Sequence, residues 1–432
     1  MHLRHPKTTA RALGAALTML GAFAAPAAFA QDQTAPAPAN PPGPATQPPP
    51  APGTTQPAPT QPAPQTPGAA PATPPPNYNF QYNGLVDGYY LFNFVNPKDT
   101  VIGGGHIYDA RNNSPTLELA ELNLFQNARP AGLGYKATLQ VGDVADTNTF
   151  DFEGANQGKG ESRYKDVAQL YGTYAFGGGG GVDLGKFFTP FGYEVTESNG
   201  NYNYSRSLAY NLVPFYHFGL RAYTPSGVLG VRGLTATGII ARSLFNTAES
   251  GVQGGSPQPG IIGQLNYADP GGRLTLIEDL GFGKDKLNAS AVTGGGTGTK
   301  STLSDTNFTY NLSSTVLAGL DYVYLYQQPD GNPHVTSTGY AVYFRQQFTP
   351  KQAYALRVSG THTDKNTDVT SYSRPYEFTA TYEYKAAANF LTRAEYRHDN
   401  ADQQGVQPFL GSSLSSARSN QDTISVSGVF TF

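Results

Sequence analysis

Residues 422–432 alternate between apolar and polar side chains, with few exceptions. One set of positions holds Ile424, Val426, Gly428, Phe430 and Phe432, and the other holds Thr423, Ser425, Ser427, Val429 and Thr431. Because strand side chains point alternately to the two faces, one face is mainly apolar and the other mainly hydroxyl. This pattern predicts a membrane-barrel strand with a lipid-facing side that ends on an interfacial aromatic residue. An amphipathic strand of a soluble β-sandwich has the same alternation.

The same period of two recurs at widely spaced places in the chain. Apolar residues alternate with Lys136, Thr138 and Gln140 along 133–141, and aromatic residues alternate with Glu377 and Glu383 along 377–384. A third apolar stripe consists of Val316, Ala318, Leu320, Tyr322, Tyr324 and Tyr326. Charged residues at every second position suit a water-filled lumen, and they are costly inside a sandwich core.

Short and long breaks between these stretches alternate along the chain. Gly and Pro recur in several of the short breaks, as tight turns prefer. The short breaks are 127–132, 177–181, 224–227, 269–272, 312–314, 349–352 and 385–389. The long breaks are 95–115, 144–164, 188–215, 242–259, 283–301, 328–334, 365–373 and 400–419. Seven short and eight long breaks predict an all-β fold. The predicted fold is a closed antiparallel transmembrane barrel of about 16 strands, within a range of 14–18, with both termini on the periplasmic side.

The chain before residue 77 reads differently. Residues 1–30 combine the basic residues Arg4, Lys7 and Arg11, a short apolar core and a small-residue cleavage site, which together predict a secretory signal peptide. Residues 31–76 hold 18 of the 34 prolines and one charge, so we expect a disordered linker. It is interpreted either as a periplasmic tether or as a passive spacer. Residues 77–432 form the predicted barrel domain.

The composition fits a barrel that has one apolar layer, on its outside, around a water-filled interior. The chain has no Cys and no Trp, 28 Tyr, 24 Phe and 50 Gly, and only 38% hydrophobic residues. The net charge is −3, and removing residues 1–30 leaves 25 basic against 31 acidic residues, or −6. This charge gives no indication of a nucleic-acid partner. Neither an H-E-x-x-H nor a G-x-S-x-G motif occurs, so we expect no catalytic residues, metal or cofactor.

Six segments carry a resemblance to a known family. The most specific is Gly185-Lys-Phe-x-Thr-Pro-x-Gly-Tyr-Glu194, within 183–198, and the others are 86–94, 117–124, 141–146, 203–207 and 214–221. These segments resemble the β-barrel porin family described as OmpL-like. The resemblance implies an integral outer-membrane barrel that acts as a channel, but it does not identify a solute.

The longest predicted loop, 188–215, is also the most aromatic. If it folds into the lumen, its charges lie near the narrowest point, where charged groups select solutes. The pore candidates are Glu194, Glu197 and Arg206 in the loop, with Lys186 and Arg221 on the flanking strands. A surface loop packed on its own aromatic residues is the alternative.

A second group of charges is predicted on the inward faces of strands. It consists of Lys136, Asp321, Arg345, Arg357, Glu377, Glu383, Arg393, Glu395 and Arg397. Acidic and basic residues balance in its C-terminal part, which argues against strong ion selectivity. Glu383 is placed to pair with Arg393 or Arg397 across neighbouring strands. The group forms a charged pore wall, a stiffening salt-bridge network, or both.

The leading functional hypothesis is passive diffusion of small hydrophilic solutes through the barrel. The alternatives are a structural outer-membrane anchor with a narrow or plugged barrel, and an outer-membrane hydrolase. The expected partners are outer-membrane lipid, the solutes, and the barrel-assembly machinery, which would recognise the last strand through Phe432. Porins of this size are commonly trimers, so a homotrimer is open to this chain, although the sequence identifies no interface.

Overall fold

The computed structural model describes residues 77–95, 106–147, 166–245, 258–286, 298–330, 333–365, 374–402 and 419–432. The predicted signal peptide and linker lie outside the described residues. The strands are β1 (Gln81–Asn93), β2 (Pro115–Gln126), β3 (Gly132–Val141), β4 (Val167–Ala175), β5 (Gly181–Phe188), β6 (Tyr216–Tyr223), β7 (Leu234–Ala241), β8 (Gln258–Ala268), β9 (Leu274–Lys286), β10 (Gly298–Asn311), β11 (Val316–Pro329), β12 (Val335–Thr349), β13 (Gln352–Lys365), β14 (Arg374–Ala387), β15 (Phe390–Asp402) and β16 (Asn420–Thr431).

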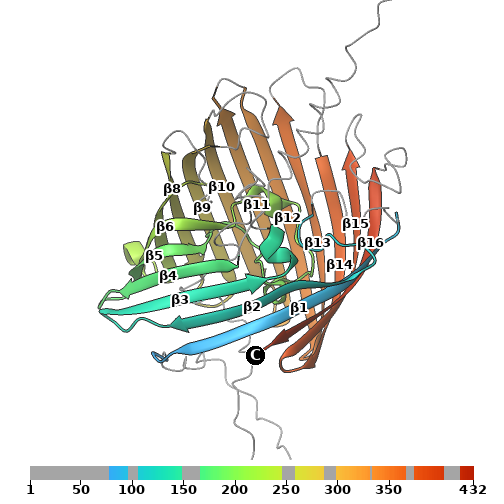
Figure 1. Ribbon diagram of the computed structural model, residues 1–432, viewed down its shortest axis with the longest axis horizontal. Helices are drawn as coiled ribbons and strands as arrows, with labels where there is room; N and C mark the ends of the chain where they lie inside the picture. The colour runs from blue at the N-terminus through green and yellow to red at the C-terminus, as the bar shows by residue number, and fades with distance from the viewer. Residues whose placement is uncertain are drawn as a thin grey trace, which may run out of the picture.

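The sixteen strands form one closed antiparallel barrel (Figure 1). Each strand pairs with its neighbours in sequence, and β1 closes the barrel against β16 with Leu85 opposite Thr431 and Asn93 opposite Thr423. The predicted fold and strand number are therefore confirmed. The seven short turns join strand ends at the end of the barrel that holds the start of β1 and the end of β16.

The two faces of β16 match the sequence pattern. The side chains of Ile424, Val426 and Phe430 are exposed on the outside, whereas Thr423 and Ser425 are buried on the inside. Outward aromatic residues also cover β11 and β14. In the part of the chain that the structure describes, no helix is long and apolar enough to cross a membrane.

The barrel wall is uneven in height. The strands β5, β6 and β7 have eight residues each, whereas β10 to β14 have 14 or 15. Figure 1 shows β5 and β6 as shorter arrows than β10 to β12. In the described parts of the connections there are three short 3₁₀ helices. Two of them, η1 (Ser198–Gly200) and η2 (Ala209–Leu212), belong to the β5–β6 connection, and η3 (Val228–Gly230) lies in the β6–β7 turn.

Candidate pore and lumen loop

The β5–β6 connection, residues 189–215, lies inside the barrel and is called the lumen loop below. Its backbone amides donate hydrogen bonds to inward side chains of the far wall. The amides of Tyr204 and Ser205 donate to the two carboxylate oxygens of Glu395 on β15, at 2.6 and 3.0 Å. The amide of Leu208 donates to the Ser359 hydroxyl on β13 at 2.9 Å. The loop is therefore held against β13 and β15, across the lumen from β5.

Arg357 on β13 is the centre of this attachment. Its guanidinium donates to Glu377 on β14 and to Glu194 of the lumen loop, both at 2.8 Å. It also donates to the Ser205 hydroxyl at 2.9 Å. The Arg357 side chain is fully buried, and so is that of Glu377. Buried charges are tolerated when they are paired and hydrogen-bonded, as this arginine is.

A second attachment holds the η1 segment. Arg393 on β15 donates to the backbone carbonyl oxygens of Ser198 and Asn201, both at 2.6 Å. The same guanidinium contacts Glu383 on β14 at 2.9 Å, and Glu383 also pairs with Arg345 on β12 at 3.0 Å. Of the two partners that the sequence left open for Glu383, the structure forms the one with Arg393.

Arg206 of the lumen loop donates its hydrogen bonds to the backbone of the loop itself. Its guanidinium donates to the carbonyl oxygens of Val195, at 3.1 Å, and of Tyr204 and Thr196. Its charged end also lies 5.1 Å from the ring centroid of Tyr108. This buried arginine therefore fixes the shape of the loop and does not line an open passage.

Part of the β1–β2 connection also lies in the lumen, which the sequence did not indicate. His106 links the loop carbonyl of Arg206, at 3.2 Å, to Asp399 on β15, at 2.7 Å. Arg397 on β15 pairs with Asp109 of the same connection, and with Asp399 at 3.1 Å. Neither His106 nor Asp109 stands in an alternating pattern, so no sequence signal marked them as inward.

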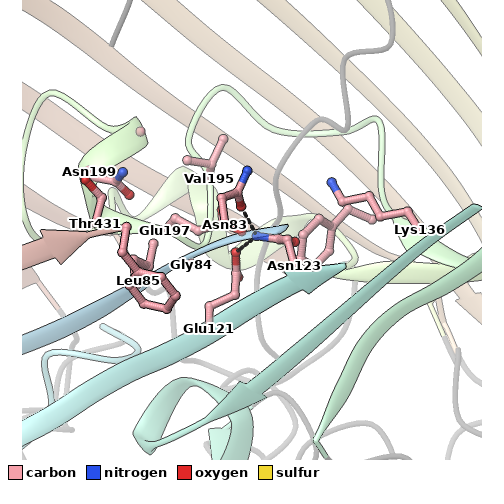
Figure 2. Close-up of a pocket in the computed structure, with 13 residues that line it drawn as sticks. Asn83, Gly84, Leu85, Glu121, Asn123, Lys136, Val195, Glu197, Asn199 and Thr431 are labelled. Atoms are coloured by element: carbon pink, nitrogen blue, oxygen red, sulfur yellow. Dashed lines mark hydrogen bonds between the residues drawn. The ribbon is translucent and has the colours of Figure 1, made fainter. Parts of the chain in front are cut away.

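A cavity of about 490 Å³ lies between the tip of the lumen loop and the β1–β3 wall (Figure 2). On the wall side, Asn123 donates to Asn83 at 3.0 Å and to Glu121 at 2.6 Å. On the loop side the cavity is lined by Val195, Glu197 and Asn199. Lys136 of β3 completes the charged lining. We call it the mouth cavity because it lies at the turn end of β1, next to Phe432.

The pKa of Glu197 is raised in the mouth cavity. Burial raises the pKa of its carboxyl well above the ordinary value of 4.5, and the adjacent negative charge of Glu121 raises it further. Lys136 acts in the opposite direction and to a smaller extent. The mouth cavity therefore brings together an acidic pair, a lysine and three asparagine side chains.

The three remaining predicted site residues are Arg221 and Asp321 on the inner face of the wall and Lys186 on its outer face. Arg221 is on the inner wall, where it pairs with Asp183 at 2.8 Å, and Asp321 is buried on the inner face of β11. Lys186 is a correction, because it is opposite the exposed Leu170 and Phe218 and thus on the outer face. Its ammonium donates to the Val167 carbonyl at 2.7 Å. The period of two that runs through the exposed Leu184 places Lys186 on the outer face. The lumen was predicted because Lys186 is close to the loop in the sequence.

A closed barrel with a charged interior, an apolar exterior and an inward loop defines an outer-membrane channel protein of the porin class. More specifically, the chain belongs to the family described as "Putative beta-barrel porin-2, OmpL-like", whose model matches residues 79–432. Among curated proteins, none matches the sequence.

Solved structures of similar fold are outer-membrane barrels. The anion-selective porin from Comamonas acidovorans has 11% sequence identity and a TM-score of 0.55, covering 82% of this chain and 99% of that one. OmpT of Vibrio cholerae, an outer membrane protein, has 11% identity and a TM-score of 0.54, covering 82% and 97%. The outer membrane channel DcaP of Acinetobacter baumannii has 10% identity and a TM-score of 0.54, with the same coverage. At these identities the likeness establishes the fold.

Proposed function

We propose that this protein is a passive outer-membrane channel for small hydrophilic solutes, with a passage along the β1–β3 side of the lumen. The observation that carries the proposal is the asymmetry of the lumen loop. The loop is bonded to the β13–β15 wall through Arg357, Glu395 and Arg393, whereas its tip borders the mouth cavity on the opposite side. Solutes that pass the loop then cross a polar space lined by charges and amides.

Two groups of charged residues have separate roles in this proposal. Glu121, Lys136 and Glu197 line the mouth cavity and set the preference for cations or anions, because their charges act on solutes in a confined space. Glu194 and Arg206 determine the width, because they hold the loop in place through buried contacts. While Glu197 keeps its proton, the charges of Glu121 and Lys136 balance, which favours uncharged solutes or weak ion selectivity.

The test is a planar-bilayer recording on the refolded barrel. We expect stable single-channel currents with a reversal potential near zero in a salt gradient. Shortening the lumen loop should raise the conductance without changing the heat-modifiable mobility of the barrel. A barrel that conducts equally with and without the loop would show that the loop does not narrow the passage.

The second candidate is a structural anchor with a plugged barrel. The observation in its favour is that two connections lie inside the lumen and are fixed to the wall by buried ion pairs. In this model residues 1–30 direct export, and residues 31–76 act as a periplasmic tether. A folded barrel that never conducts, even after the lumen loop is shortened, would establish the anchor in place of the channel.

A further inference from the structure

The wall of the mouth cavity carries opposite charges with an amide between them. On β2 and β3, Glu121 is opposite Gln140, and Asn123 is opposite Thr138. Lys136 lies two residues beyond Thr138 on β3. Figure 2 shows Glu121 and Lys136 on opposite sides of Asn123. The order along this wall is therefore carboxylate, amide, ammonium.

The separation of the two charges fits a short peptide. Four residues of β3 separate Lys136 from Gln140, the partner of Glu121, and they span about 13 Å of strand. Strand side chains stand roughly perpendicular to the sheet, so their charged ends keep a similar separation. An extended dipeptide is about 7 Å long. A charge-assisted hydrogen bond of about 2.8 Å at each end brings its span close to that separation, whereas a single amino acid is too short.

The middle of the wall offers hydrogen bonds to the peptide group of such a solute. The side-chain amide of Asn123 donates to Asn83, and its carbonyl accepts from the Thr138 hydroxyl at 2.7 Å. Among the described residues, none accepts a hydrogen bond from the amide nitrogen of Asn83. That nitrogen therefore keeps its two donors for a ligand, and a peptide carbonyl is a suitable acceptor.

The acidic end of the cavity holds a proton that an ammonium group can replace. Glu197 of the lumen loop is hydrogen-bonded to Glu121, and burial and then this neighbouring charge raise the pKa of Glu197. Glu121 accepts from Asn123 at 2.6 Å and from Gln140 at 2.7 Å. A carboxylate has about four acceptor positions, so Glu121 still has room for an ammonium group. When that group binds, the proton of Glu197 passes to the solvent.

We propose that the mouth cavity binds zwitterionic dipeptides, with the ammonium group between Glu121 and Glu197 and the carboxylate on Lys136. The inference rests on the proposed channel and names its solutes. Lysine has three donors, so a contact of Lys136 within the protein leaves donors for a solute. The cavity of about 490 Å³ has the size of a small-ligand site. Leu85 and Val195 also line it, which suits small apolar side chains on the peptide.

Isothermal titration calorimetry on the refolded barrel in detergent tests binding without any need for conduction. The probe is dialanine. Its matched analogues are N-acetyl-dialanine, which lacks the ammonium group, dialanine amide, which lacks the carboxylate, and free alanine, which is shorter. We expect dialanine to bind at least about tenfold more tightly than each analogue, because each analogue leaves one charged end of the cavity unpaired.

Lys136→Gln removes the contact that dialanine amide also lacks. This substitution should weaken the binding of dialanine about tenfold and leave the affinity for dialanine amide unchanged, because the two losses are the same interaction. The matched control is Lys351→Gln at the exposed turn between β12 and β13, which should change neither affinity.

Proton release gives a second readout at the acidic end. Titrations in two buffers of different ionisation enthalpy should show that the wild type releases about one proton per dialanine, and that Glu197→Gln releases none. Equal affinities for dialanine and its analogues, no binding of dialanine, or normal binding by Lys136→Gln would overturn the proposal. A barrel that conducts salt without binding dialanine loses this solute class and keeps the proposed channel. A barrel that binds dialanine without conducting keeps the site and loses the channel.

Discussion

The guanidinium of Arg357 on β13 donates a hydrogen bond of 2.8 Å to the carboxylate of Glu194, in the loop that crosses the lumen. The same guanidinium binds Glu377 on the neighbouring strand at 2.8 Å. This buried side chain, together with Glu395 and Arg393, ties the lumen loop to the barrel wall. The position of the loop, and with it the width of any passage, depends on this contact.

We expect Arg357→Leu to destabilise the barrel by about 3–5 kcal/mol, because it leaves Glu194 and Glu377 buried without their partner. The substitution should also free the loop and raise the single-channel conductance. Unfolding in urea, followed by circular dichroism in detergent, measures the first effect.

Arg111→Leu is the control for this prediction. The Arg111–Asp143 pair lies at the protein surface, with about half of the arginine side chain exposed. Removing such an exposed pair should cost about 0–1 kcal/mol. If both substitutions cost the same, Arg357 does not anchor the loop.

Ion selectivity should depend on the mouth cavity and not on the loop anchor. We expect Lys136→Gln to move the reversal potential in a salt gradient toward cation preference. Glu197→Gln should move it toward anion preference only at a pH high enough to ionise Glu197, because burial raises the pKa of that carboxyl well above 4.5. Glu194→Gln should leave the reversal potential unchanged while raising the conductance, because Glu194 is bonded to Arg357. A shift in selectivity from Glu194→Gln alone would place the narrowest point at the anchor instead.

The fold was predictable from the sequence because alternation and turn spacing are local properties. The inward charges of β12 to β15 followed from the same period of two, and Arg345, Arg357, Glu383, Arg393, Glu395 and Arg397 all face inward. The pair of Glu383 with Arg393 followed from the sequence too. The partners of Arg357 and Arg397 on connections, Glu194 and Asp109, did not follow, because the path of a connection depends on tertiary contacts. Sequence position alone could not show that Glu194 is an anchor and Glu197 a cavity residue.

The charge of the mouth cavity should vary with pH. Burial, and then the charge of Glu121, raises the pKa of Glu197 above 4.5, so the folded protein holds this proton more tightly than the unfolded chain. As pH rises above 4.5 the unfolded chain loses this proton first, so the folded barrel loses stability relative to the unfolded chain. The cavity gains negative charge only at the higher pH at which the folded carboxyl ionises. Cation preference should therefore increase with pH in a range well above 4.5, where the Glu197 carboxyl ionises. In Glu197→Gln most of this increase should disappear, and an unchanged pH profile would exclude Glu197 as its source.

Closure of the barrel depends on the last residue. The amide of Gly84 donates to the Phe432 carbonyl at 3.0 Å, and the Phe432 amide donates to the Gly84 carbonyl at 3.0 Å. The Phe432 ring covers Gly84 so closely that an added Cβ would stand 2.5 Å from it. Phe430 stacks beside Phe432 on the outer face, with ring centroids 6.4 Å apart. The terminal aromatic pair therefore covers the seam between β1 and β16.

We expect Phe430→Ala combined with Phe432→Ala to reduce the yield of folded, heat-modifiable barrel in the outer membrane several-fold. The seam loses its aromatic cover, and the assembly machinery loses the end of the strand that we expect it to recognise. The matched control is Phe308→Ala with Tyr310→Ala, an aromatic pair on β10 that also stacks at 6.4 Å. Both double substitutions remove similar apolar area, so a general loss of interfacial aromatics would lower both yields equally. A selective loss in the terminal variant identifies closure and recognition as the cause, and an equal loss would refute the special role of the C-terminal strand.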